Sequence, residues 1–122
     1  MKIFVILGAV LGGLGVAAGA FGAHALRAQL EPRMLEVFET GVRYQMYHAL
    51  ALLASAWVVQ QTEATAAHIA GWAFVAGVLL FSGSLYAMAF TGIRGLGAVT
   101  PVGGAAFLVG WAALAVAALR LR

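Results

Sequence analysis

The side chains in this sequence that could bind a ligand or move a proton are few, and the densest group surrounds His48. Arg43 and Tyr47 lie within about one and a half helical turns of it, and Tyr44 precedes it by four residues, a spacing that places two side chains on one face of a helix. These groups could form a small site for a lipid headgroup, an anion or a proton. We favour the alternative that they form an internal hydrogen-bond network, which would hold the helices in register.

The composition places this group inside a membrane protein. Of 122 residues, 64% are hydrophobic and 9% are charged, whereas a soluble globular domain has roughly 45–50% and about 25%. These values exclude a soluble enzyme domain, a disordered tail and a disulfide scaffold, and the length fits a single domain over residues 1–122. The Lys and Arg residues are dispersed at segment ends, which is typical of charges that flank membrane spans and excludes a nucleic-acid-binding patch.

Metal, cofactor and enzyme chemistry have little support in the sequence. There is no Cys, so thiolate metal sites and redox pairs are excluded. No two His residues are three or four positions apart, and no carboxylate lies inside an apolar run. We therefore expect no metal, no cofactor and no enzymatic activity, since acid–base and nucleophilic arrangements are also missing at the level of the chain.

Four apolar runs predict four membrane-spanning helices, at about residues 3–25, 43–60, 67–90 and 100–119. A helix needs about 20 residues to cross the hydrocarbon core. Backbone groups in hydrocarbon must be hydrogen-bonded within their own segment, so the expected fold class is all-α, a four-transmembrane-helix antiparallel bundle. The first run is longer than the apolar core of a usual secretory signal, and we expect it to be retained as a span.

The connection between the first two spans carries most of the charge of the protein, with three Arg and three Glu in residues 27–43. Pro32 suits the first position of a helix, and the apolar residues after it recur at helical spacing. This pattern predicts a short amphipathic helix over about residues 32–42 that lies at the membrane surface. Such a helix could sense lipids, but we favour a solvated helix that turns the chain. An unbroken helix from Pro32 to Gln60 would be about 43 Å long, so a bend near Gly41 is expected.

Glycines form a seam along the first span. Successive members are 4, 3, 4 and 3 residues apart, which is a 3.5-residue period and therefore one face of a helix. Glycine lets two backbones approach closely, and close packing drives helix association in lipid. We expect the seam to pack within the chain against small residues of the fourth or the third span, with self-association of two copies as the alternative. The seam consists of Gly8, Gly12, Gly15, Gly19 and Gly22.

The antiparallel order of the spans brings most polar residues to one side of the bundle. The end of the first span, the start of the second, the end of the third and the start of the fourth share that side. For His48 we expect Tyr86, Ser84 or His24 as a partner, because an ionisable group within a span usually faces the interior and is paired. Trp111, inside the last span, needs a partner for its indole N–H or a place at the interface. The predicted polar cluster consists of His24, Arg43, Tyr44, Tyr47, His48, Ser82, Ser84 and Tyr86.

Four motifs in the chain resemble those of a known family. They are residues 19–24 (GAFGAH), 42–50 (VRYQMYHAL), 81–86 (FSGSLY) and 100–104 (TPVGG). In this order, over nearly the whole chain, they resemble the domain of unknown function 423 family, which looks related to the eukaryotic transmembrane protein 256 proteins. The resemblance implies a small multi-pass protein of the bacterial inner membrane. It implies no activity and carries over no catalytic residues.

Two hypotheses of function follow. The first is a structural or interaction protein that acts alone, as a homo-oligomer or as an accessory subunit of a larger membrane complex. The second is a small transporter, or a lipid- or ion-binding protein, that uses the polar cluster in one half of the bilayer. The lipid bilayer is a partner under both. We expect both termini in the cytoplasm, because Lys2, Arg120 and Arg122 lie directly at span ends and positive charge favours that side.

Overall fold

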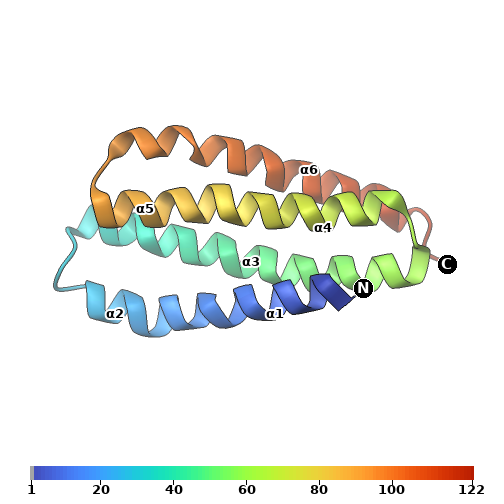
Figure 1. Ribbon diagram of the computed structural model, residues 1–122, viewed down its shortest axis with the longest axis horizontal. Helices are drawn as coiled ribbons and strands as arrows, with labels where there is room; N and C mark the ends of the chain where they lie inside the picture. Colours follow the sequence, from blue (N-terminus) through green and yellow to red (C-terminus); the bar gives the residue numbers. More distant parts are fainter. Residues whose placement is uncertain (1) are drawn as a thin grey trace.

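The computed structural model describes residues 2–122, and these residues form helices joined by short connections, without a strand. Figure 1 shows the helical stretches lying side by side, with the two termini at the same end. The first stretch contains α1 (Lys2–Val16), the π-helical η1 (Ala17–Gly22) and α2 (Ala23–Leu26). The second is α3 (Pro32–Thr62). The third contains α4 (Thr65–Gly77), the π-helical η2 (Val78–Ser82) and α5 (Gly83–Thr91), and the fourth contains the 3₁₀-helical η3 (Arg94–Ala98) and α6 (Thr100–Ala118).

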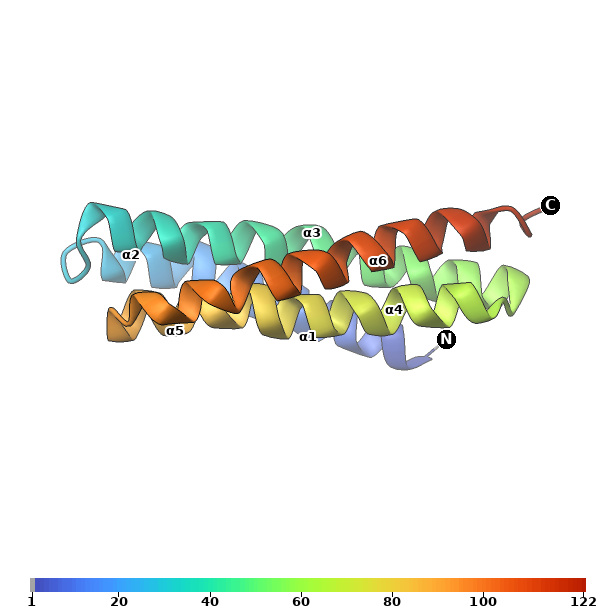
Figure 2. The same ribbon diagram turned by 90° about the horizontal axis from the view of Figure 1, so that it is seen from above.

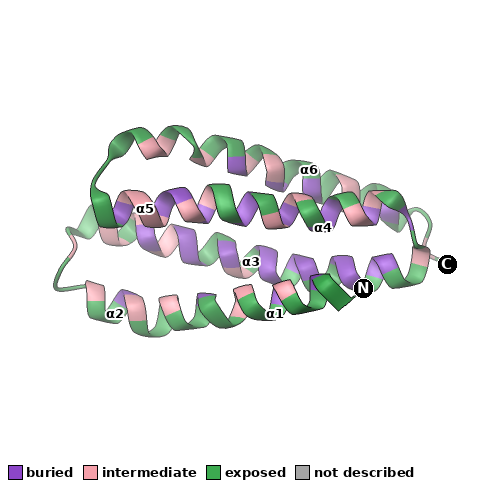
Figure 3. Cartoon of the chain, in the orientation of Figure 1, coloured by how far each residue is buried: buried purple, intermediate pink, exposed green. Residues whose placement is uncertain are grey.

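Three of these stretches are long and apolar enough to cross a membrane, namely Lys2–Leu26, Thr65–Thr91 and Arg94–Ala118. They coincide with the first, third and fourth predicted spans. Many large apolar side chains point away from the bundle, among them Leu14, Phe21 and Leu108. Figure 3 shows this distribution, with the buried residues concentrated on the inward sides of α3 and α4. An apolar exterior of this kind is suited to hydrocarbon rather than to water.

The separate surface helix expected over residues 32–42 is not present, because α3 is a single helix of 31 residues. It does not break at Gly41. A Cβ at this glycine would lie 2.8 Å from Cε1 of Tyr86, so the glycine makes room for a ring instead of bending the chain. Phe38 and Val42 are buried in a cluster with Ala23, which means that the apolar face of the first turns packs on protein.

The glycine seam packs against α3, and not against the third or fourth span as expected. A Cβ at Gly8 would lie 2.9 Å from the carbonyl oxygen of Ala49, and one at Gly19 would lie 3.0 Å from Val42. A Cβ at Gly15 would collide with the side chain of Met46. The seam therefore lets α1 and α3 approach closely within one chain.

Two glycines of the third and fourth stretches are covered by phenylalanine rings of the opposite stretch and are therefore not free to receive the seam. Phe74 of α4 packs over Gly110 of α6, where an added Cβ would lie 2.5 Å from its ring. In return, Phe107 of α6 packs over Gly77 of α4. The bundle thus contains two close pairs, α1 with α3 and α4 with α6, and α3 joins them by packing on α4 and α5. Figure 2 shows α6 crossing over the third stretch, while α1 lies on the far side of the bundle.

Candidate functional site

His48 is the most deeply placed ionisable group of the predicted cluster, with 4% of its surface exposed. Its Nδ1 lies 2.6 Å from the carbonyl oxygen of Tyr44, and the indole Nε1 of Trp111 lies 3.1 Å from its Nε2. A carbonyl oxygen only accepts and an indole N–H only donates. The imidazole must therefore be neutral, with the hydrogen on Nδ1 and the lone pair of Nε2 facing the indole. Trp111 of α6, and none of the three expected residues, is its side-chain partner.

Aromatic rings enclose this imidazole. The ring of Phe107 stacks on it with centroids 3.5 Å apart and planes 6° from parallel. The ring of Phe74 lies 5.5 Å from it in a tilted arrangement and packs edge-on against Trp111 at 5.0 Å. His48 thus holds α3 to α6 through one hydrogen bond and through ring packing, in surroundings that leave both of its nitrogens occupied.

A second network joins α1, α3 and α5 through Gln45, a residue with 5% of its surface exposed. Its amide Nε2 donates to the carbonyl oxygen of Leu11 at 2.8 Å. Its Oε1 accepts a hydrogen bond of 2.6 Å from the hydroxyl of Tyr86. The two ends of one amide therefore connect two neighbouring helices to α3.

Two serines make further links between helices. Ser82, which lies in η2 and is fully buried, donates to the carbonyl oxygen of Gly41 at 2.7 Å. Ser84 and Thr100 share a hydrogen bond of 2.6 Å between their hydroxyls, which ties α5 to the start of α6. Each serine thus fastens the third stretch to a different neighbour.

The remaining members of the predicted cluster lie outside these networks. His24, Arg43 and Tyr47 are exposed on the outer faces of their helices. The guanidinium of Arg43 donates to Oγ1 of Thr40, a neighbour on the same helix, at 3.0 Å. Tyr47 packs edge-on against the half-exposed ring of Tyr44 at 5.6 Å. The eight residues therefore do not all converge on one site. Six of them take part in hydrogen bonds between or within helices, and they do so in separate small networks.

Three side chains that link helices lie outside the predicted cluster, namely Gln45, Thr100 and Trp111. A helical period could have found Gln45, because it shares the buried face of α3 with Val42, Ala49 and Leu52. Trp111 has no such local signal, since its neighbour in space is 63 positions away in the sequence.

The buried polar side chains are arranged to form hydrogen bonds between helices. Within residues 2–122, every buried polar side-chain atom has a hydrogen-bond partner, and no group of three His, Asp or Glu residues is placed to hold a metal ion. A groove of about 380 Å³ opens beside His48 toward the exterior, and aromatic and apolar side chains form most of its wall. The groove is lined by Tyr44, Tyr47, His48, Phe81, Gly104, Phe107, Leu108 and Trp111.

A comparison with protein families places this chain. Residues 18–104, which contain most of the residues described above, match the family model described as Protein of unknown function (DUF423). The chain belongs to the DUF423 family. The DUF423 match covers in full all four motifs that carried the resemblance, residues 19–24, 42–50, 81–86 and 100–104.

Curated relatives of this DUF423 chain are bacterial membrane proteins. The UPF0382 membrane protein YwdK of Bacillus subtilis is 46% identical over 121 residues, which covers 98% of each chain. The UPF0382 membrane protein SERP0230 of Staphylococcus epidermidis is 43% identical, also over 98% of each chain. No solved structure matches the chain. The family and these relatives show that this is a membrane protein.

Proposed function

We propose that this DUF423 protein is a four-span, antiparallel protein of the bacterial plasma membrane that acts as a structural or interaction component. It would work alone, as a homo-oligomer or as an accessory subunit of a larger membrane complex, and it would carry out no chemical reaction. One observation carries this proposal. Every buried polar side-chain atom of residues 2–122 has a hydrogen-bond partner. Several of these hydrogen bonds join one helix to another, so the buried polar side chains serve to hold the bundle together.

The outer stripe of α3 supports its crossing of the membrane. Exposed residues recur along it at intervals of four and three, which is one face of the helix. The stripe begins at Arg43 and ends at Gln61, and between them it carries Tyr47, Leu50, Ala54 and Trp57. From Arg43 to Gln61 the helix rises by about 27 Å, close to the ~30 Å of the hydrocarbon core. On this basis the first three turns of α3 project beyond the hydrocarbon.

The alternative function, a small transporter or an ion-binding protein that uses the polar cluster, needs polar atoms that are free to bind. The nitrogens of His48 face Tyr44 and Trp111, and the amide of Gln45 is used at both ends. A transported ion would first have to break these bonds. The arrangement therefore favours the structural role.

The topology is tested by labelling single cysteines, which is straightforward because the chain has no Cys of its own. We would introduce Gln29→Cys and Gly95→Cys at one end of the bundle and Gln61→Cys at the other. A membrane-impermeant maleimide applied to whole cells and to inverted vesicles should label the first two from the same side and the third from the opposite side. Labelling of positions 29 and 95 from opposite sides would refute the four-span arrangement.

The structural role is tested by extraction into a mild detergent followed by native mass spectrometry. We expect one species of defined stoichiometry, which is the single chain, a homo-oligomer or a complex with other membrane proteins. Proteoliposomes that contain the purified chain should not conduct ions or small solutes faster than empty liposomes. A solely monomeric protein that catalyses solute flux would support the transporter and contradict the proposal.

A further inference from the structure

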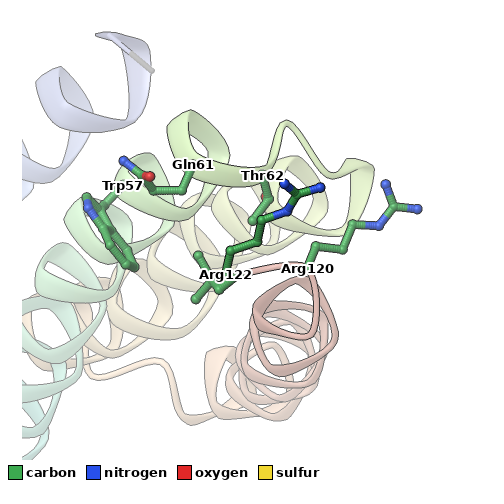
Figure 4. A pocket seen from close by; sticks show the side chains of 6 residues that line it. Trp57, Gln61, Thr62, Arg120 and Arg122 are labelled. Carbon is green, nitrogen blue, oxygen red and sulfur yellow. The ribbon is translucent and has the colours of Figure 1, made fainter.

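A polar pocket of about 770 Å³ lies at the terminal end of the bundle, between the last turns of α3 and the residues that follow α6. Figure 4 shows Arg122 reaching toward Thr62, while the side chain of Gln61 extends toward Trp57 and Arg120 points away. Trp57 forms another part of the wall. Two arginines thus line the pocket, together with an amide and an indole, and only Arg122 turns its guanidinium group toward α3. The polar cluster analysed from the sequence contributes nothing to it.

The pocket and the aromatic groove beside His48 lie on the same side of the molecule. Both are formed mainly by residues of α3 and of the fourth stretch, and Phe81 of η2 completes the groove. The outer stripe of α3 passes through both, since Tyr47 lines the groove and Trp57 and Gln61 line the pocket. Gln61 and Tyr47 are about 21 Å apart along the helix, so in the proposed arrangement the groove begins beyond the middle of the ~30 Å hydrocarbon core.

A matching stripe runs along α6. Residues exposed or half-exposed at intervals of four and three lead from Gly104 in the groove to Arg122 in the pocket. Between these ends the stripe carries Leu108 and Trp111 and then the small residues Ala115 and Ala118. The seam between α3 and α6 is thus charged at the terminal end, lined by small residues in the middle and aromatic in the half of the bundle nearer Arg43.

We propose that this seam binds an anionic phospholipid, with its phosphate-bearing headgroup in the pocket and an acyl chain along the seam toward the aromatic groove. The site rests on the four-span arrangement proposed above, because that arrangement places Gln61 and Arg122 at a membrane surface. The planar guanidinium donates two parallel hydrogen bonds to a phosphate, and the amide of Gln61 can donate a third. Trp57 occupies the headgroup level that tryptophan favours.

Anionic lipid is the occupant that charge complementarity selects. Of the six described residues that line the pocket, two are arginines and the others are uncharged. Basic pockets between membrane helices are suited to negatively charged headgroups. A zwitterionic lipid would bring its own cation into a pocket that already holds two positive charges.

The test uses the full-length protein in detergent with added phosphatidylglycerol or phosphatidylcholine, and bound lipid is counted by native mass spectrometry. The wild-type chain should retain phosphatidylglycerol over phosphatidylcholine and melt at a higher temperature with it. The Arg120→Gln/Arg122→Gln double variant should bind phosphatidylglycerol about tenfold more weakly, the loss of one charge-assisted contact. The matched control Arg33→Gln/Arg94→Gln, which removes the same charge from the other end, should bind as the wild type does.

Three outcomes would overturn the proposal. One is equal retention of phosphatidylglycerol by the Arg120→Gln/Arg122→Gln variant and the control. A second is equal retention of the two lipids by the wild-type chain. The third is stabilisation by soluble glycerol 3-phosphate equal to that by phosphatidylglycerol, which would indicate a site for a free phosphate.

The double variant Arg120→Lys/Arg122→Lys keeps both positive charges but lacks the planar guanidinium, and it should bind phosphatidylglycerol with intermediate strength. None of these results alters the cysteine-labelling pattern, so failure of the lipid site is distinguishable from failure of the topology.

Discussion

The packing of α6 on η2 can be tested with two adjacent glycines. A Cβ at Gly103 would lie 2.7 Å from the Cα of Phe81 and 2.8 Å from its Cβ. These are backbone-anchored atoms, so the two helices must move apart to admit it. A Cβ at Gly104 would lie 4.0 Å from the ring of the same phenylalanine, which is an ordinary contact. The two substitutions Gly103→Ala and Gly104→Ala therefore differ in packing alone.

The expected magnitude follows from this comparison. Replacing glycine with alanine in a helix gains up to about 1 kcal/mol of helix propensity, and this gain is common to both variants because they are neighbours in the first turns of α6. Overpacking costs about 1–3 kcal/mol, and it applies to Gly103→Ala only. We therefore expect Gly103→Ala to be less stable than Gly104→Ala by about 1–3 kcal/mol, with Gly104→Ala at or slightly above the wild type.

The assay is reversible unfolding in mixed micelles with increasing sodium dodecyl sulfate, followed by circular dichroism of the helical band. The free energies of unfolding of the two variants are compared with each other under identical conditions, so that lipid and detergent effects cancel. A Gly103→Ala variant as stable as Gly104→Ala would refute the close approach of α6 to Phe81, and with it the arrangement of the third and fourth stretches.

Three further predictions concern the links within the bundle. Gly15→Leu should lower the melting temperature in detergent, because the new side chain would meet Met46. The control Gly13→Leu, at a position that faces open space, should melt as the wild type does. Equal melting temperatures of the two variants would contradict the glycine seam. His48→Leu leaves the indole of the last span without an acceptor and should cost about 1–2 kcal/mol of unfolding free energy, measured by the same denaturation; a change below the error would show that this hydrogen bond does not hold the helices. Tyr86→Phe removes one hydroxyl donor and should cost about 0.5–1.5 kcal/mol by that measurement, and an increase in stability would argue against the α3–α5 link.

The sequence predicted the helices better than it predicted their contacts. The apolar runs located the first, third and fourth stretches, because hydropathy and length are properties of one segment. The spacing of the glycines marked a close helix contact, since a 3.5-residue period depends on one helix only. The prediction of a separate surface helix was wrong because the amphipathic face around Phe38 has the same sequence pattern whether it contacts lipid or protein. In the structure this face packs on α2 and α5.

In the candidate site, too, the sequence identified a residue that must be buried but did not identify its partner. His48 could be recognised as a group that needs partners, because a histidine within an apolar run is costly to leave unpaired. Its partner could not be recognised, since Trp111 lies 63 positions away in the sequence, and only the crossing of α6 over the third stretch brings the two together.

Composition and periodicity were therefore sufficient for the class of protein, the approximate bounds of three candidate spans and the glycine face of the first one, all of which depend on the chemistry of neighbouring residues. Which helix meets which was decided only in three dimensions, where Phe74 and Phe107 fill the gaps at Gly110 and Gly77 and leave α3 to receive the glycines of α1. The physical reason is that partner choice in a bundle depends on complementary shape between distant segments. A stripe of small residues on one helix does not indicate which large side chain of another helix will pack against it.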